Sequence, residues 1–225
     1  MQVHLVIPPP HPKTPNWRKN AMKLYYSPGA CSLSPHIALL EAGLPYDLVK
    51  VDLRAKKLES GEDFWAVNPK GQVPALSLNS GELVTEGPVI VQMIADQAAA
   101  KHLAPPRDSN ERYKFLEWLN YITTELHKNL GPMFAPVLSD DAKAFFKDRA
   151  MGKFKYVDGQ LAGKDYLMGK QFTVADGYMF TMLSWAERMK WDLAGLSNLM
   201  AYKARVAARP KVQEALTKEG LLKAA

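Results

Sequence analysis

The sequence predicts an α/β domain followed by an all-α domain, and three observations lead to this fold class. Short runs of β-forming residues alternate with helix-like periodic segments up to residue 101. A proline-rich segment follows, and beyond it apolar residues recur at helical spacing with no strand pattern between them. The predicted divisions are a disordered N-terminal extension over residues 1–21, an α/β domain over 22–101, a linker over 102–108 and a helical domain over 109–225.

The composition argues against a membrane-spanning protein and against a nucleic-acid-binding protein. The chain has 225 residues, of which 47% are hydrophobic and 23% charged, as in an ordinary globular protein. No apolar run approaches the roughly 20 residues that a bilayer span needs. Half of the net charge of +6 lies in the tail, on Lys13, Arg18 and Lys19, and later basic residues are mixed with acids, so no stripe for nucleic acid is expected. A single cysteine favours a reducing, cytoplasmic location.

The first 21 residues carry five of the 16 prolines and no periodic pattern, which predicts an extended or disordered tail without a function of its own. The apolar stretch Val3–Ile7 is too short for a secretory signal. Met22 directly precedes the first predicted strand and is an alternative start of translation.

The first strand and helix enclose the only cysteine. Lys23–Tyr26 reads as a strand, Pro28-Gly29 as a turn, and Leu33, Ile37 and Leu40 recur at helical spacing up to Gly43. Cys31 therefore lies at a helix N-terminus, where a thiol pKa can fall to roughly 3.5–7.5, and Ser32 can cap the helix or bond the sulfur. The alternative is that Cys31 is a small buried hydrophobe, as most free cysteines are.

Three further strands are expected in this domain. Tyr46–Asp52 alternates in polarity, and its place after a strand and a helix predicts a right-handed βαβ unit with parallel strands. Lys56 follows in a polar loop, and Phe64-Trp65 marks a short helix or turn. A third strand starts at Pro74, and Asn79-Ser80-Gly81 turns the chain into a fourth, Leu83–Thr85.

The sequence leaves two alternatives open at each of two positions beside these strands, the peptide bond before Pro74 and the helix start at Gly87. A cis bond before Pro74 would expose the N–H and C=O of Val73 to an extended ligand, although base rates favour trans. Glu86-Gly87-Pro88 opens the next helix, where Gly87 leaves bare N–H groups suited to a carboxylate or is simply a flexible cap.

From Ser109 onward the pattern is helical. Two apolar stripes are expected in the core, Phe115, Leu119, Ile122 and Leu126 in one and Ala142, Phe146, Ala150, Phe154, Val157 and Leu161 in the other. Phe172 and Thr173 precede an almost wholly apolar helix as a hydrophobic staple and a capping box with Asp176, which predicts a structural role for that acid and a central position for that helix.

Four separated motifs, taken together, resemble the glutathione S-transferases, specifically the bacterial, cysteine-containing beta class, over about residues 22–222. They are Tyr26-Ser27-Pro28-Gly29-Ala30-Cys31-Ser32, Asn68-Pro69-Lys70-Gly71-Gln72-Val73-Pro74-Ala75-Leu76, Thr85-Glu86-Gly87 and Trp118-Leu119-Asn120-Tyr121-Ile122-Thr123-Thr124-Glu125-Leu126-His127-Lys128. The resemblance implies a thioredoxin-like N-terminal domain, an all-α C-terminal domain, a homodimer, and glutathione as co-substrate with no tightly bound cofactor.

The resemblance also implies site residues. Cys31 and His127 would be catalytic, Cys31 beside the glutathione sulfur and His127 near it. The alternative for the histidine is a core or surface position without a role in the site. Val73 would pair its backbone with the cysteinyl part, Glu86 and Gly87 would receive the γ-glutamyl end, and Lys56 the glycyl carboxylate. Further glutathione-binding positions would be Tyr26, Ser32, Gln72, Pro74, Asn120, Thr124 and Lys128. Gly87 stands where many members have serine, so one hydroxyl contact is missing.

Phe134, Tyr178 and Trp185 are expected to line an apolar electrophile pocket, or to be plain core. His36 and His102 lack ligand-like spacing, so no metal site is predicted. The expected activity is conjugation of the glutathione thiolate to hydrophobic electrophiles. Glutathione-dependent thiol–disulfide exchange through Cys31 is the second enzymatic hypothesis. The alternative from another class is a non-catalytic ligand-binding or interaction protein on the same fold.

Overall fold

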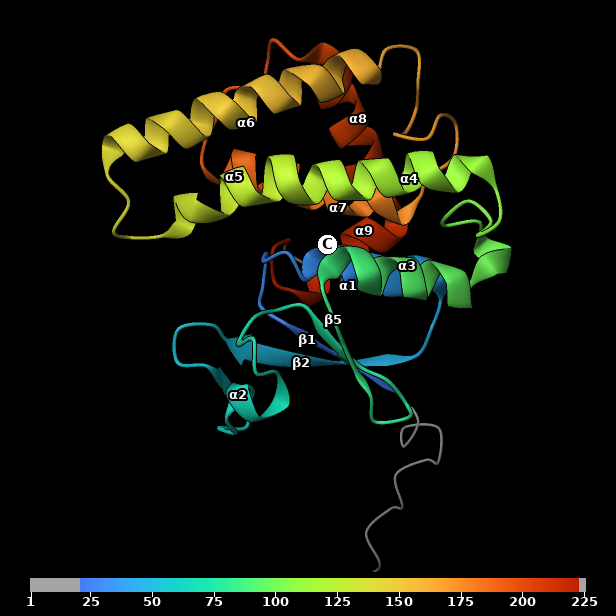
Figure 1. Cartoon of the computed structure of the whole chain (residues 1–225), viewed down its shortest axis with the longest axis vertical. Helices are drawn as coiled ribbons and strands as arrows, with labels where there is room; N and C mark the ends of the chain where they lie inside the picture. The colour runs from blue at the N-terminus through green and yellow to red at the C-terminus, as the bar shows by residue number, and fades with distance from the viewer. Residues whose placement is uncertain (1–20, 223–225) are drawn as a thin grey trace, which may run out of the picture.

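The computed structural model describes residues 21–222, so the predicted tail, apart from Ala21, lies outside the described residues. Figure 1 shows a sheet with α1 and α3 on the face toward the helical domain and α2 on the other face. The helical domain lies beyond α1 and α3, with α6 as its outermost helix in this view. The α/β domain followed by a helical domain is the predicted order, while the exact domain boundaries stay a prediction.

The sheet confirms the predicted βαβ unit. Its strands, in the order β3-β2-β1-β4-β5 across the sheet, are β1 (Met22–Tyr26), β2 (Tyr46–Asp52), β3 (Lys57–Leu58), β4 (Ala75–Ser77) and β5 (Leu83–Thr85). β1 and β2 are parallel, and α1 (Leu33–Ala42) connects them. β4 runs antiparallel to β1, and the predicted hairpin joins it to β5. The two-residue strand β3 was not expected, because so short a pairing leaves no periodic signal.

Helix α1 is the element on which the two domains meet. Nine of its ten residues are buried, because the sheet covers one side and α3 (Gly87–Gln97), α7 (Val174–Arg188) and α9 (Pro210–Lys218) cover the other. A helix between two layers has no broad solvent-facing side, which explains why apolar residues are not confined to one face and why its polar residue His36 is also buried. It ends at Gly43, whose φ of 69° is left-handed and suits glycine.

The remaining helices build the second domain and the edges of the first. They are α2 (Phe64–Val67), η2 (Ala99–Lys101), α4 (Asn110–Tyr121), the π-helix η3 (Ile122–His127), α5 (Lys128–Leu130), η4 (Gly131–Phe134), α6 (Asp140–Gln160) and α8 (Ser197–Ala207). The first predicted core stripe is fully buried. In the second, Ala142 and Phe146 are only half-buried, since the start of α6 projects past α5 (Figure 1).

Helix α7 occupies the centre of the helical domain, as predicted, and its start is fixed by the predicted capping box. The Asp176 carboxylate is fully buried and accepts from the Thr173 N–H at 2.8 Å, the Leu167 N–H at 2.9 Å and the Tyr202 hydroxyl at 2.9 Å. Burial raises the pKa of this carboxyl, and the hydrogen bonds oppose that shift. Asp176 therefore has the structural role that the sequence predicts.

Across the described range, no helix combines the length and the apolar character needed to cross a lipid bilayer.

Candidate functional site

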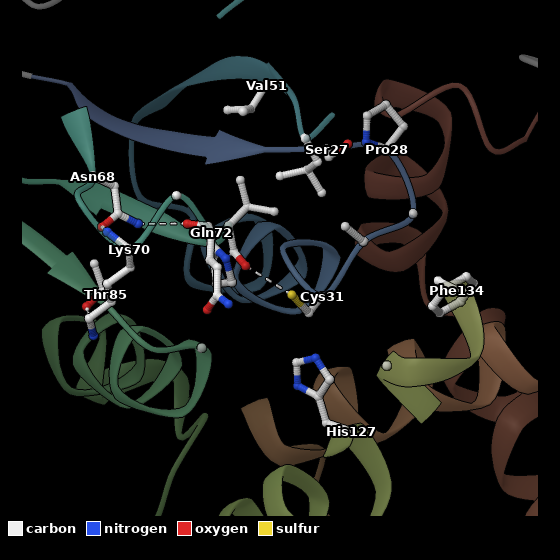
Figure 2. Close-up of a pocket in the computed structure, with 18 of the residues that line it drawn as sticks. Ser27, Pro28, Cys31, Val51, Asn68, Lys70, Gln72, Thr85, His127 and Phe134 are labelled. Atoms are coloured by element: carbon white, nitrogen blue, oxygen red, sulfur yellow. Dashed lines mark hydrogen bonds between the residues drawn. The ribbon is translucent and has the colours of Figure 1, made fainter. Parts of the chain in front are cut away.

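A cleft of about 1050 Å³ lies where the two domains face each other, and Cys31 lines it. The α/β domain supplies a wall that includes Lys56, Gln72, Val73, Pro74, Glu86 and Gly87, hereafter the α/β wall. The helical domain supplies Thr123, His127, Lys128, Gly131, Phe134, Tyr178, Trp185 and Arg188, hereafter the helical wall. Figure 2 shows His127 pointing toward Cys31 from the opposite side of the cleft. Both residues predicted to be catalytic thus face each other.

The Cys31 thiol is not the acidic group that its helix-start position predicts. Burial raises the pKa of the Cys31 thiol to about 12, although the N–H groups of Cys31 and Ser32 and the charge of Lys128 favour the thiolate. The residue keeps intermediate exposure, and its Sγ donates to the Val73 carbonyl oxygen at 3.1 Å. Of the two alternatives for Cys31, the lowered pKa is wrong, because desolvation outweighs the backbone donors. The other alternative agrees better, since Cys31 is partly buried against the hydrophobic core.

The backbone edge beside the sulfur adopts the cis form, which is the less common of the two alternatives that the sequence left open. The Val73–Pro74 peptide bond is cis, and Val73, Pro74 and Gln72 all line the cleft. The buried Asn68 side chain holds this turn by donating from Nδ2 to the Gln72 carbonyl oxygen at 2.7 Å (Figure 2). Asn68 belongs to the motif that marks this turn, but its own contribution was not predicted.

Glu86 stands at the start of α3 in an uncommon backbone conformation. Its φ of 70° lies in the left-handed region, where a residue other than glycine is strained. Lys70 reaches the same place, forming an ion pair with the Glu86 carboxylate and donating to the Thr85 hydroxyl at 2.9 Å. Sequence reasoning missed Lys70, because its partners lie 15 and 16 positions further along the chain.

Lys56 lies at the edge of the cleft, also with a left-handed φ, of 54°. Its Nζ donates to the Gly71 carbonyl oxygen at 2.7 Å and lies 5.7 Å from the centre of the Trp65 ring. The ammonium group is therefore held beside the Gly71–Pro74 segment, where it can meet an anionic group of a bound molecule.

The helical wall is a series of aromatic rings in contact. His127 packs edge-on against Trp185, with 5.0 Å between ring centroids, and Phe134 packs on Trp185 in the same way at 5.0 Å. His127 Nδ1 and the Tyr178 hydroxyl share a hydrogen bond of 2.6 Å. All three rings border the cleft. Only Phe134 is exposed, whereas Tyr178 and Trp185 are buried in the core, which is the alternative that the sequence left open for them.

His127 is neutral at pH 7 in this setting. Burial, and secondarily the charge of Lys128, lowers the pKa of His127 to about 4. The Tyr178 hydroxyl, whose pKa burial raises, keeps its proton and can donate it to Nδ1. The ring proton then resides on Nε2, which can donate a hydrogen bond into the cleft. His127 can therefore assist a nearby sulfur as a neutral donor, but not as a cation.

A buried network fixes the loop that carries Cys31 from behind. The Gly29 N–H donates to Glu219 Oε2 at 2.8 Å, and the Trp185 indole N–H donates to the Gly29 carbonyl oxygen at 2.8 Å. Glu219 also bonds His36 Nδ1 at 2.8 Å, and His36 Nε2 bonds the Tyr46 hydroxyl at 3.0 Å. The C-terminal helix and α7 therefore both position the Cys31 loop. No sequence signal connects positions 190 residues apart.

Four predicted glutathione-binding residues do not line the cleft. Tyr26 is buried beside α1, where its ring lies 6.4 Å from that of His36. Ser32 is buried and neither caps α1 nor bonds the sulfur, because its hydroxyl accepts from the Ser27 N–H and donates to the Ser27 carbonyl oxygen.

Asn120 and Thr124 lie on the exposed side of the same helical segment, one turn apart. The neighbouring Thr123 lines the cleft instead. A helix turns by about 100° per residue, so adjacent residues face different surroundings, and the π-helical turn at Ile122–His127 shifts this phase further. Arg188, at the end of α7, is a further lining residue that the sequence did not single out.

Comparison with known proteins extends these observations. The family models described as the N-terminal and C-terminal domains of glutathione S-transferase match residues 29–97 and 124–219. The glutathione S-transferase GstA of Escherichia coli O157:H7 is 49% identical over 89% of this chain and 100% of that protein.

Two solved structures are similar over 89% of this chain and 100% of theirs. A sphingomonad glutathione S-transferase complexed with glutathione is 48% identical, with a TM-score of 0.86. A bacterial beta-class enzyme from Sphingomonas chungbukensis is 46% identical, with a TM-score of 0.86.

Proposed function

The chain belongs to the glutathione S-transferase family, and from this premise we propose that its cleft binds glutathione and directs the sulfur at an apolar electrophile. Its relatives are named as transferases, and the chain is an enzyme of that class. The sphingomonad relative was solved with glutathione bound. The roles of individual residues in this chain are part of the proposal.

The tripeptide lies along the α/β wall. The Val73 N–H and C=O pair with its cysteinyl part, and the bare N–H of Gly87 donates to its γ-glutamyl carboxylate. Glu86 accepts from the γ-glutamyl ammonium, and Lys70, which is paired with Glu86, adds a second charge at that end. Lys56, beside Gly71, meets the glycyl carboxylate.

The sulfur of glutathione then lies between Cys31 and His127. Val73 accepts from Cys31 Sγ at 3.1 Å, so a peptide paired with the Val73 backbone would have its cysteinyl part beside Cys31. This position is supported most directly by His127, which points toward Cys31 across the cleft (Figure 2), and by the hydrogen bond that joins Cys31 to Val73. When the cysteinyl N–H of glutathione takes the Val73 carbonyl oxygen in place of Cys31, the Cys31 S–H is free to turn toward the glutathione sulfur. Neutral His127 can donate its Nε2–H, so both groups stabilise a glutathione thiolate.

The reaction is a nucleophilic substitution or addition on the electrophile. With an aryl chloride, the thiolate forms a C–S bond to the ring carbon, chloride leaves with its bonding electron pair, and the thiol proton is released to solvent. Phe134, Tyr178 and Trp185 hold the apolar ring against the nucleophile, so that proximity contributes to the rate.

Thiol–disulfide exchange through Cys31 is the second candidate activity. The Cys31 thiolate would attack the glutathione sulfur of a mixed disulfide, forming a Cys31–glutathione disulfide as the substrate thiolate leaves. A second glutathione thiolate would then attack this disulfide, releasing oxidised glutathione and the Cys31 thiolate. The raised Cys31 pKa, about 12, leaves a very small thiolate fraction at pH 7, which favours conjugation over exchange.

Assembly and location complete the proposal. Val89 on α3 and Tyr113 on α4 expose large apolar side chains, 49% and 73% accessible, as a subunit interface would need. We expect a homodimer, which sedimentation equilibrium tests. The lone cysteine supports a reducing, cytoplasmic location.

The test compares two activities in three proteins. Conjugation of 1-chloro-2,4-dinitrobenzene and reduction of a glutathione mixed disulfide are measured in the wild type, Cys31→Ala and His127→Ala. The proposal expects conjugation in the wild type, retained in part by Cys31→Ala and lowered about tenfold or more in His127→Ala, a loss of 1.4 kcal/mol or more of transition-state stabilisation.

Other outcomes assign the residues differently. Disulfide reduction that disappears in Cys31→Ala while conjugation survives assigns the cysteine to redox chemistry. Wild-type protein that binds glutathione in calorimetry but is inactive in both assays contradicts the proposal and supports a ligand-binding protein.

A further inference from the structure

The helical wall carries positive charge without any acid. Of the lining residues that the helical domain supplies, Lys128 and Arg188 are basic and none is Asp or Glu. The acids that line the cleft, Asp52, Glu59 and Glu86, all belong to the α/β domain. An apolar electrophile alone would not need cations on this wall.

Arg188 occupies a different part of the helical wall from Lys128, the basic residue near Cys31. Lys128 acts on Cys31 and His127, since its charge lowers the pKa of both groups. Arg188 lies at the far end of the aromatic series, with its guanidinium carbon 5.9 Å from the centre of the Phe134 ring. Its Nη1 lies 3.7 Å from the point that a Cβ on Gly29 would occupy, so the guanidinium borders the loop that ends in Cys31.

The charge of Arg188 is available for a ligand. Arg188 takes part in none of the ion pairs found among residues 21–222. Arginines of this domain whose role is structural are paired, Arg209 with Glu41 and Arg112 with Asp96. Arg188 is exposed and packs its planar group over an aromatic ring instead.

We propose that Arg188 selects flat aromatic electrophiles that carry a carboxylate. The ring would pack against Phe134 and Trp185, with its reacting carbon toward the glutathione sulfur and its carboxylate toward the guanidinium. Arginine matches a carboxylate with two parallel N–H donors, which fixes the orientation of the ring as well as its charge. The proposal rests on the proposed function and adds the substrate class.

Glutathione itself is anionic, and the position of Arg188 separates the two ligands. The side chains that can take up the ends of the tripeptide, Lys56, Lys70 and Glu86, belong to the α/β wall. Figure 2 shows Lys70 and Thr85 on one side of Cys31 and Phe134, the neighbour of Arg188, on the other. A contact to glutathione would therefore change the KM for glutathione, and a contact to the electrophile would change the discrimination between electrophiles.

The experiment uses a matched pair of electrophiles, 4-chloro-3,5-dinitrobenzoate and its neutral amide, 4-chloro-3,5-dinitrobenzamide. The ratio of kcat/KM for the anion to that for the amide is measured in the wild type, Arg188→Gln, Arg188→Lys and Lys190→Gln. Lys190 is an exposed cation two residues further on that does not line the cleft, so its variant controls for net charge.

The expected result is an anion-to-amide ratio about five- to tenfold lower in Arg188→Gln, the range for one charge-assisted contact that is partly exposed to water. Arg188→Lys should recover part of the ratio, and Lys190→Gln should leave it unchanged. A ratio that is equal in the wild type and Arg188→Gln overturns the proposal, and so does a raised KM for glutathione with an unchanged ratio.

Binding of the two reaction products separates this proposal from the proposed function. The glutathione conjugates of the benzoate and the amide are titrated into each protein by calorimetry, which needs no turnover. If the wild type converts neither electrophile and also fails to conjugate 1-chloro-2,4-dinitrobenzene, the proposed function fails. Tighter binding of the anionic conjugate that is lost in Arg188→Gln would still support the role of Arg188, and equal binding would overturn it.

Discussion

The two walls of the cleft are held in place by different means. On the α/β wall, several side chains are held by donating to backbone carbonyl oxygens, as Cys31 does to Val73, Lys56 to Gly71 and Asn68 to Gln72. On the helical wall, aromatic side chains from segments far apart touch one another, as do His127 and Tyr178, 51 residues apart. The first wall suits one extended peptide, whereas the second offers a surface that side-chain changes can reshape.

The largest expected effect concerns the Cys31 thiol on the α/β wall. Because burial raises its pKa to about 12, the rate of alkylation by iodoacetamide should rise about tenfold per pH unit from pH 7 to 10, about a thousandfold in all. The rate is measured by mass spectrometry of the intact protein. Urea-unfolded protein is the control, and its rate should level off near the ordinary thiol pKa of about 8.5. A plateau below pH 9 in the folded protein would contradict this prediction.

The next prediction removes the anchor of the helical wall. Asp176→Ala leaves the buried N–H groups of Leu167 and Thr173 and the Tyr202 hydroxyl without their acceptor, at a cost of about 3–4 kcal/mol of unfolding free energy. Urea unfolding followed by circular dichroism measures this loss. Asp192→Ala removes a carboxylate that accepts only one exposed N–H, that of Ala194, and should cost less than about 1 kcal/mol. Equal losses in both variants would refute a special role for Asp176.

The same contrast explains how far the sequence could predict the structure. Local signals were sufficient for β1, α1, β2, the β4–β5 hairpin and the capping box of α7, since each depends on neighbouring residues. The sequence motifs also predicted that Cys31, Val73 and His127 belong to one site, and all three line the same cleft.

What failed depends on tertiary structure. The thiol pKa is raised by burial, which no spacing reports. Tyr26 and Thr124 do not line the cleft, whereas the residues next to them in the sequence, Ser27 and Thr123, do. The ties from Gly29 to Glu219 and Trp185 join segments at least 156 residues apart.

A smaller effect is expected from His127 on the helical wall. Its folded-state pKa of about 4 lies below the ordinary value of 6.5, so the unfolded chain binds more protons between these two pH values. The unfolding free energy is therefore unaffected by His127 protonation above pH 6.5. It decreases as the pH falls from 6.5 to 4, because protons bind preferentially to the unfolded chain. His127→Asn, which keeps an acceptor near Tyr178, should reduce the loss of unfolding free energy between pH 7 and 4 by about 2 kcal/mol. Equal pH profiles of the two proteins in urea unfolding would argue against a buried neutral imidazole.

The smallest effect tests the missing hydroxyl on the α/β wall. A Cβ built on Gly87 would meet only Pro74 Cγ, at 3.7 Å, which is an ordinary contact. Gly87→Ser should therefore fit without a backbone shift and add one hydrogen bond to the γ-glutamyl carboxylate of glutathione. One such bond is worth about 0.5–1.5 kcal/mol, or about a two- to tenfold lower dissociation constant.

Gly87→Ala is the matched control, because it adds the same Cβ without the hydroxyl. Calorimetric titration of glutathione into the three proteins should rank Gly87→Ser above the wild type, with Gly87→Ala close to the wild type. If Ala and Ser tighten binding equally, the gain comes from a stiffer backbone at the start of α3 rather than from the hydroxyl. If neither variant changes the affinity, the γ-glutamyl carboxylate does not lie at Gly87, and the placement of the peptide along the α/β wall has to be revised.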